Sequence, residues 1–226
     1  MRILIVAATD SEIAALAAKL YDRARIAPRA NQCEYKQHNV DVLTTGVGMV
    51  ATAAWCSQML TENRYDLALD LGVCGSFDRE IELAQVVHVT SDCIAELGAE
   101  DDQNFLTVQD LGLADANEFP FTEGRLINAS PPISTTLSAL TAVAGITVNT
   151  VHGSEQSIAT VKRRFQPQVE SMEGAAFMYT CMIHRVPFAQ IRAVSNLVEK
   201  QNRNAWQLSD AIRNLTEMGL RILEEV

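Results

Sequence analysis

The stretch from Val169 to Trp206, VESMEGAAFMYTCMIHRVPFAQIRAVSNLVEKQNRNAW, determines the predicted fold more than any other part of the chain. Its segment Met172–Ala176 is typical of a point where a strand gives way to a helix that packs through small residues. The apolar run Phe188–Val194 predicts a buried strand, which stops at the polar pair that follows it. The stretch therefore predicts two strand ends and one helix start close together.

The first of these strand ends carries an acid, Glu173, and the second carries an amide, Asn196. Open α/β sheets bind small molecules in the crevice outside the carboxyl ends of their strands. We therefore expect the two side chains to face one ligand site. These few residues alone also suit a helix-capping glutamate and a turn asparagine, and the pattern leaves both interpretations open.

Outward from this stretch, buried β-rich runs alternate with segments of helical spacing. The expected strands are Arg2–Ala8, Cys33–Lys36, Val40–Thr44, Leu67–Leu71, Val86–Thr90 and Ile146–Val151. The expected helices follow Thr9 and Gly48 and span Ser154–Phe165 and Ala205–Val226, the last with Leu208, Ile212, Leu215, Gly219 and Ile222 facing inward. This order predicts a single α/β domain over residues 1–226, a three-layer αβα sandwich with a central mixed β-sheet.

One segment, Ala95–Gly124, interrupts this alternation because it is polar and acidic and has few regular signals. About thirty loop-like residues inside one domain are usually functional or held by a partner. We expect this segment to be a long excursion from the sheet.

Composition excludes several classes of partner. The formal net charge is −10 and no basic run occurs, so nucleic acid is not an expected partner. The opening apolar run Ile3–Ala8 is too short for a membrane span or a signal peptide, so we expect a cytoplasmic protein without a membrane partner. Five scattered cysteines without C-x-x-C favour reduced thiols, and four histidines without ligand spacing predict no metal site.

Glycines follow or end several of the expected strands: Gly46 and Gly48, Gly72 and Gly75, and Gly153. Glycine lets a backbone approach a ligand closely, although glycines also end strands for purely steric reasons. Gly46-Val47-Gly48 lacks the third glycine of a dinucleotide fingerprint, and no phosphate-binding G-x-x-x-x-G-K motif occurs. We therefore expect no cofactor.

Three side chains have the chemistry needed to break a bond to a sugar. Glu12 could act as a general base on water, Glu173 could accept hydrogen bonds from two ribose hydroxyls, and Asn196 could bind a departing base. Glu12 could equally complement the dipole of the helix that it begins. Trp206 and Phe165 are more typical of core residues than of stacking platforms.

The whole chain resembles the purine nucleoside phosphorylase / methylthioadenosine nucleosidase superfamily. The matching segments are MRILIVAATDSEI, TTGVGMVATA, LDLGVCGS, VESMEGAA and RAVSN. Within that superfamily the chain is most similar to the futalosine hydrolases, the nucleosidases of the alternative menaquinone pathway, through AELGAEDDQNF, QDLGL, TVHGSEQSI and SNLVEKQNRNAW. The resemblance implies the superfamily's αβα fold and the release of hypoxanthine from futalosine.

The resemblance also implies roles for individual residues. Glu12 matches the glutamate that activates water, and the segment around it lacks the arginine of the phosphorylases' phosphate site, which favours hydrolysis over phosphorolysis. Met172 and Glu173 match the pair that packs beneath the ribose and binds its hydroxyls. Gly75 and Ser76 match the turn beside the sugar and the attacking water.

Asn196 stands where adenine-cleaving members have an aspartate that protonates N7 of the base. An amide cannot deliver a proton, but it can donate a hydrogen bond to N7, and mammalian-type phosphorylases of 6-oxopurines use asparagine in this way. The resemblance therefore implies hypoxanthine as the leaving base.

Futalosine carries a carboxyphenyl-oxopropyl group at its 5′ side, so the resemblance implies an apolar slot that ends in a cation. The excursion Ala95–Gly124, with Phe105, Phe119 and Phe121, is the expected wall of this slot, and it could act across a homodimer. The candidate cations for the carboxylate are Lys200, Arg203 and Arg163.

Three alternatives stay open. The first is a methylthioadenosine/adenosylhomocysteine or aminodeoxyfutalosine nucleosidase, against which Asn196 argues. The second is an inosine/guanosine phosphorylase, which would require phosphate. The third is a non-catalytic purine-binding protein on the same fold, against which the presence of both Glu12 and Glu173 argues.

Overall fold

Eleven strands form one mixed sheet in the computed structural model, which describes residues 1–102, 104–200 and 205–226. Along the main path the strands lie in the order β2-β3-β4-β1-β5-β12-β11-β6-β10-β9, and β13 pairs with both β5 and β6. Their bounds are β1 Arg2–Ala7, β2 Tyr21–Ala27, β3 Ala30–Tyr35, β4 His38–Thr44, β5 Leu67–Ser76, β6 Val86–Asp92, β9 Phe121–Thr122, β10 Arg125–Ile127, β11 Thr141–Thr147, β12 Val169–Ser171 and β13 Phe188–Leu197.

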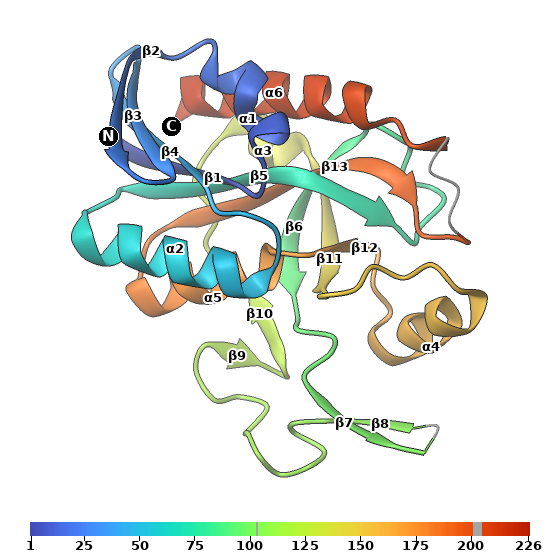
Figure 1. Ribbon diagram of the computed structural model, residues 1–226. Helices are drawn as coiled ribbons and strands as arrows, with labels where there is room; N and C mark the ends of the chain where they lie inside the picture. Colours follow the sequence, from blue (N-terminus) through green and yellow to red (C-terminus); the bar gives the residue numbers. More distant parts are fainter. Residues whose placement is uncertain (103, 201–204) are drawn as a thin grey trace.

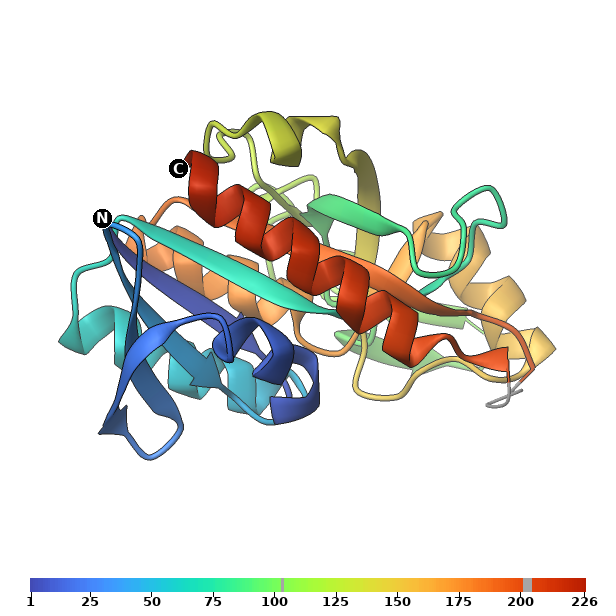
Figure 2. The same ribbon diagram turned by 90° about the horizontal axis from the view of Figure 1, so that it is seen from above.

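Helices cover both faces of this sheet (Figure 1). Helices α1 (Asp10–Ala17), α3 (Thr135–Ala139) and α6 (Leu208–Glu225) bury Ile13, Leu16, Leu137, Leu215 and Ile222 in one apolar cluster with the sheet. Helices α2 (Met49–Glu62) and α5 (Gly174–His184) form the second cluster on the opposite face. Figure 2, a view from above, shows α6 lying across the sheet. The predicted three-layer αβα architecture is confirmed.

Five strands of the sheet close into a ring. β5 pairs with β12, β12 with β11, β11 with β6, β6 with β13, and β13 again with β5. The sequence predicted that the two strand ends of the stretch Val169–Trp206 are neighbours. They are not paired directly, because β5 lies between β12 and β13. The long, buried β5 can pair on both of its edges, which makes its carboxyl end the centre of the site described below.

Several predicted elements are confirmed, and others differ for local reasons. β5 runs past Leu71 to Ser76 because its glycines make room for neighbouring side chains instead of ending the strand. β11 spans Thr141–Thr147 where Ile146–Val151 was predicted, so it begins and ends earlier. It ends at Thr147 since Glu96 accepts the backbone N–H groups of the next turn. The predicted inward face of α6 holds at Leu215, Gly219 and Ile222, whereas Leu208, at the helix start, is 40% exposed. β2 was not predicted, because its side chains are mostly exposed and give no apolar run.

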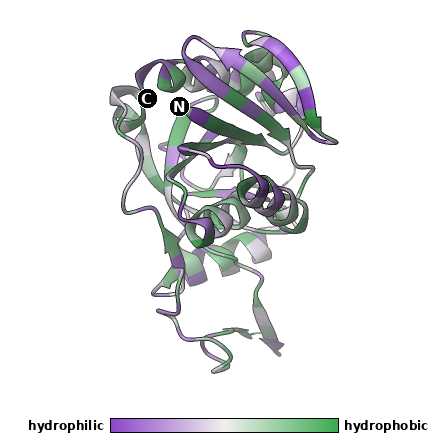
Figure 3. Ribbon diagram, turned by 90° about the vertical axis from the view of Figure 1, so that its left-hand side faces the viewer, coloured by the Kyte–Doolittle hydropathy of each residue, from purple (hydrophilic) through white to green (hydrophobic). Residues whose placement is uncertain are grey.

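The excursion, residues 95–124 and here called the arm, has more regular structure than predicted. It contains the hairpin of β7 (Gly98–Asp101) and β8 (Asn104–Thr107), and it ends with β9. Figure 3 shows the arm reaching away from the sheet and its helices. Leu113 and Phe119 on the arm are 75% and 68% exposed. A separate helix, α4 (Glu155–Phe165), lies beside it. No helix within the described ranges is both long and apolar enough to cross a membrane.

Candidate active site

Glu12 is buried at the start of α1, with 8% of its surface exposed. Its Oε2 accepts hydrogen bonds from the backbone N–H and the hydroxyl of Thr9, at 2.9 and 2.8 Å, which closes the first turn of the helix. Its Oε1 accepts the backbone N–H of Val73 on β5 at 3.1 Å. One oxygen thus serves the helix start, as the alternative interpretation expected, and the other faces the carboxyl end of β5.

Glu173 lies between β12 and α5, at the N-cap position, but its side chain makes no cap hydrogen bond to its own helix. Its Oε1 accepts the backbone N–H of Gly48 at 2.9 Å instead. Burial raises the pKa of the Glu173 carboxyl above its ordinary value, although Arg192 and the Gly48 N–H act in the opposite direction. The capping interpretation of Glu173 is therefore wrong. The adjacent Met172 is partly exposed.

Arg192 connects these acids and was missed by the sequence analysis. It lies on β13, is 1% exposed, and forms an ion pair with the buried Asp70 of β5. Burial alone would lower the pKa of the Arg192 guanidinium, but Asp70, Glu173 and Glu12 together raise it above its ordinary value. The signal in the sequence was an arginine inside the apolar run Phe188–Val194, since a charge in a buried strand requires a buried partner.

Gly72 explains how so many charged groups can meet. A Cβ on this glycine would lie 2.7 Å from Nη1 of Arg192 and 3.1 Å from Oε1 of Glu12. The missing side chain therefore leaves the space in which the guanidinium and the carboxylate approach each other. This is a case in which a glycine is required for close approach and not for a turn.

Asn196 lies at a bulge of β13, opposite Gly75 of β5. Its Oδ1 accepts from the Ser195 hydroxyl at 2.9 Å, and its Nδ2 donates to the carbonyl of Leu197 at 3.0 Å. One hydrogen of Nδ2 remains for a ligand. Because Asn196 lies within β13 and not in a turn, the turn interpretation is wrong.

A cavity of about 80 Å³ lies beside Asn196, lined by Gly75, Leu83, Val151, His152, Glu170, Asn196, Leu197, Glu199, Ala205 and Trp206. Trp206 is 39% exposed and so is not a core residue, contrary to expectation. Phe165 packs partly buried beside the arm. Among the described residues, no group of three His, Cys, Asp or Glu side chains could hold a metal ion.

Ser76 differs from the other predicted site residues. It is 1% exposed, and its hydroxyl donates to the carbonyls of Asp78 and Gln168 at 2.8 and 3.3 Å. The hydroxyl also accepts the backbone N–H of Asp78. The structure thus brings Gly75 to the cavity but turns the Ser76 side chain into the neighbouring loop.

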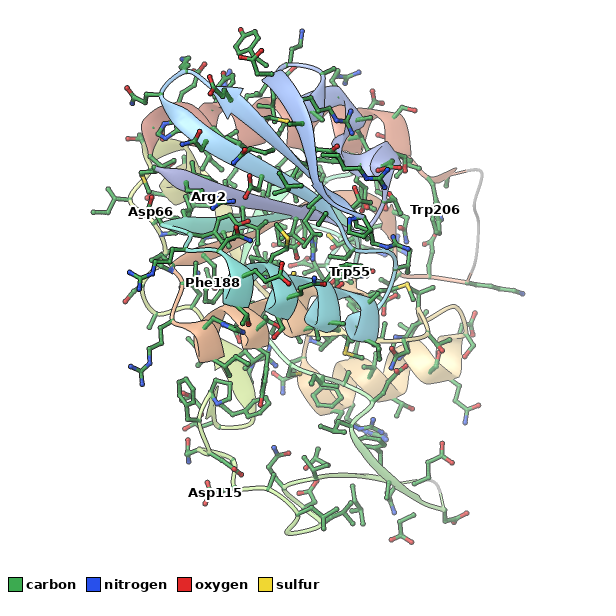
Figure 4. The ribbon with its side chains drawn as sticks, turned by 60° about the vertical axis from the view of Figure 1, so that its left-hand side comes forward. Arg2, Trp55, Asp66, Asp115, Phe188 and Trp206 are labelled. Atoms are coloured by element: carbon green, nitrogen blue, oxygen red, sulfur yellow. The ribbon has the colours of Figure 1, made fainter. Side chains whose placement is uncertain are left out.

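The arm does not line the cavity beside Asn196. Phe105 stacks against Arg164, with the guanidinium carbon 4.1 Å from the ring centroid. Phe121 packs against Tyr179, with the two ring centroids 5.9 Å apart. Figure 4 shows Asp115 on the arm, well apart from Trp206. Of the candidate cations, Arg163 and Lys200 are exposed, and Arg203 lies outside the described residues. The arm as the wall of a 5′ slot therefore stays a prediction.

Comparisons with known proteins agree with this architecture. The sequence profile of the phosphorylase superfamily matches residues 2–225. A futalosine hydrolase of Streptomyces coelicolor is 31% identical over 185 residues, covering 78% of this chain and 75% of that protein. A futalosine hydrolase of Acidothermus cellulolyticus is 30% identical over 225 residues, covering 94% of this chain and 86% of that protein. A 5′-methylthioadenosine/S-adenosylhomocysteine nucleosidase from Colwellia psychrerythraea, solved in complex with adenine, has a TM-score of 0.82 at 20% identity, covering 99% and 95%.

Proposed function

The chain belongs to the phosphorylase superfamily, as its motifs predicted, and we propose that it is a futalosine hydrolase. The reaction is hydrolysis of the N-glycosidic bond of futalosine, which releases hypoxanthine and dehypoxanthine futalosine in the futalosine route to menaquinone. The observation that carries the proposal is an amide, Asn196, in the cavity beside Gly75, together with two buried glutamates on the adjacent strand and helix ends.

In this proposal the ribose lies between Glu173 and Glu12. Glu173 accepts hydrogen bonds from the ribose hydroxyls beside Met172, and Glu12 holds and activates the attacking water through the oxygen that faces β5. Arg192 offsets the negative charge of the two glutamates within one buried site. As the C1′–N9 bond breaks and C1′ gains oxocarbenium character, the water oxygen bonds to C1′ and Glu12 takes a proton from it. The departing hypoxanthine anion takes a proton from solvent, and Glu12 returns its proton to solvent.

Asn196 stabilises the leaving base in this mechanism. Its free Nδ2 hydrogen donates to N7 as negative charge develops on the departing hypoxanthine. A single preorganised donor of this kind lowers an activation barrier by about 3 kcal/mol. Gly75 carries no side chain of its own, which leaves room at this point of β5 for Val198, Asn196 and Glu170 to come together beside the base.

The proposal includes a cytoplasmic homodimer. The exposed apolar side chains of the arm, Leu113 and Phe119, support an interface there, since large exposed apolar residues on a projecting segment favour contact with a partner. An arm that lies away from its own cavity could wall the 5′ side of the partner's site. Light scattering at micromolar concentration should give twice the 24.8 kDa chain mass, and a monomer would contradict this part.

The experiment that tests the activity is chromatography of released base from futalosine, inosine and methylthioadenosine, each with and without phosphate. We expect hypoxanthine from futalosine at a rate that phosphate does not change. Adenine from methylthioadenosine would instead identify an adenine-cleaving nucleosidase. Phosphate-dependent release from inosine would identify a phosphorylase, and binding of purines without turnover would identify a non-catalytic binding protein.

A further inference from the structure

Gly75 forms a floor between two polar side chains that come from different strands. Glu170 of β12 and Asn196 of β13 are both paired with Gly75 in register. A Cβ on Gly75 would lie 2.8 Å from Cγ2 of Val198, 3.2 Å from Nδ2 of Asn196 and 3.6 Å from Cγ of Glu170. Both side chains therefore lie on the same face of the sheet, one on each side of the glycine, and both line the cavity.

The Glu170 carboxylate is held in place by His152. The His152 backbone N–H donates to Oε1 at 3.1 Å, and Nδ1 lies 2.7 Å from Oε2. Only 3% of the Glu170 side chain is exposed. The His152 ring is held in turn by an edge contact with Phe77, with the ring centroids 6.1 Å apart. Glu170 is thus a fixed acceptor, and its two oxygens have acceptor positions that His152 does not use.

No part of the proposed bond cleavage uses this carboxylate. Its other neighbours across the cavity include the apolar side chains of Leu83, Val151 and Leu197. A carboxylate in such surroundings is costly unless donors satisfy it, and a ligand that fills the cavity removes the remaining water. His152 already donates to both Glu170 oxygens, and a ligand with an N–H or O–H group at this point would use the acceptor positions that remain.

We propose, building on the hydrolase function above, that Glu170 accepts the N1–H of the 6-oxopurine base and so selects hypoxanthine over adenine. Asn196 binds the opposite, N7 edge of the same ring. Hypoxanthine carries a proton on N1, whereas N1 of adenine is an acceptor without a proton. An adenine in this position would place a lone pair against the Glu170 carboxylate and leave both groups unpaired. Buried polar groups that lose their partners give strong discrimination.

The test compares two substrates that differ only in the base, futalosine and aminodeoxyfutalosine. The measured quantity is the ratio of their kcat/KM values, because the shared ribose and 5′ group cancel in it. In the Glu170→Gln variant the side-chain amide can offer either a donor or an acceptor to N1. We expect the preference for futalosine to fall by about 100-fold, as expected when a matched polar pair is lost.

Glu96→Gln is the matched control. Glu96 is also a carboxylate that holds the loop before α4, through the backbone N–H groups of Asn149 and Thr150 at 2.7 and 3.3 Å, but it does not line the cavity. In the Glu96→Gln variant, the ratio of kcat/KM for futalosine to kcat/KM for aminodeoxyfutalosine should stay at the wild-type value. An equal fall in both variants would show that loop position, not contact with N1, sets the preference, and it would overturn the inference.

An unchanged ratio in a folded Glu170→Gln protein would also overturn the inference and would leave the hydrolase function intact. Wild-type protein that releases no hypoxanthine from futalosine would contradict the proposed function itself, which is a distinct result. If Glu170→Gln does not fold, His152→Phe provides the second variant, since it keeps an aromatic ring against Phe77 and removes the Nδ1 donor. Its ratio should fall in the same direction, and an unchanged ratio would count against the inference.

Discussion

At the scale of single residues, the site depends on one guanidinium surrounded by carboxylates. Arg192 is fully buried among Asp70, Glu12 and Glu173. Glu12 and Glu173 also accept backbone N–H groups, whereas Asp70 forms an ion pair with Arg192. A buried charge that loses its partner is strongly destabilising, whereas a balanced group keeps several charges close together. Glu12→Gln and Glu173→Gln are both expected to lower activity, and Glu173→Gln is also expected to change stability.

Glu12→Gln should lower kcat by about 10²- to 10⁴-fold, because an amide cannot take a proton from water. The matched control is Asp10→Asn, which removes the other acid of the first turn of α1. Asp10 is exposed and accepts from the Thr44 hydroxyl at 2.9 Å. If Glu12 only complemented the helix dipole, both variants would lose the same small amount of stability and keep their activity. Steady-state kinetics and thermal unfolding of both variants separate the two cases.

Glu173→Gln should abolish most activity and raise the thermal unfolding midpoint at neutral pH. Burial raises the pKa of Glu173 above its ordinary value of 4.5, so ionisation is less favourable in the folded chain than in the unfolded chain. A group of this kind lowers stability as pH rises above 4.5, and a neutral glutamine removes that cost. The gain should disappear below pH 4.5, where the glutamate is protonated in both states. A lower midpoint at neutral pH would contradict the expected sign.

At the scale of elements, the start of α5 is fixed by close packing behind Glu173. A Cβ on Gly174 would overlap Nε2 of Gln190 and lie 2.5 Å from Oδ2 of Asp92. Gln190 Nε2 donates to Asp92 at 3.1 Å, and the Thr147 hydroxyl accepts the backbone N–H of Ala175 at 2.7 Å. Side chains from three strands thus position the helix whose first turn follows Glu173.

Gly174→Ala should destabilise the protein by about 1–3 kcal/mol, the usual cost of overpacking a buried position. For a chain of this length that corresponds to a midpoint lower by roughly 2–10 °C. Adding Gln190→Ala to the same chain removes the overlapping side chain. The double variant should therefore lose less unfolding free energy than the sum of the losses in the two single variants. Strict additivity in thermal unfolding would show that the overlap at Gln190 is not the cause.

At the scale of the whole molecule, the closed ring of β5, β12, β11, β6 and β13 buries a histidine. His88 of β6 is 5% exposed, and its Nε2 has no hydrogen-bond partner among the residues that the structure describes. Burial lowers the pKa of His88 from 6.5 to about 4. The neutral imidazole is therefore part of the folded core of the ring, and protonation of the unfolded chain competes with folding in acid.

The unfolding free energy should fall as pH falls from 6.5 to 4, by up to about 3 kcal/mol from His88. A base whose pKa is lower in the folded chain than in the unfolded chain does not reduce stability above its unfolded-state pKa. Stability falls as pH drops below that pKa, because the unfolded chain then binds the proton more readily. Burial raises the pKa of Asp92 to about 6, which acts with the opposite sign in part of this range. The decisive quantity is thus the difference in unfolding free energy between wild type and His88→Gln, measured by denaturant unfolding at each pH. That difference should change with pH only below 6.5, and a constant difference would contradict the role of His88.

The amino-acid sequence by itself determined the class of the fold, most of the strands and helices, and the positions of Glu12, Glu173 and Asn196 at element ends. These features follow from local patterns: apolar runs, capping residues and the spacing of helical faces. Its motifs also identified the superfamily.

The tertiary structure alone decided which strands are neighbours, and therefore which side chains share a site. Arg192 meets Asp70, and Glu170 meets Asn196 across Gly75, only because β5 pairs on both edges. Strand pairing depends on contacts between residues far apart in the chain, and no local pattern encodes the partner. The same cause explains why the closed ring and the position of the arm away from the cavity could not be predicted.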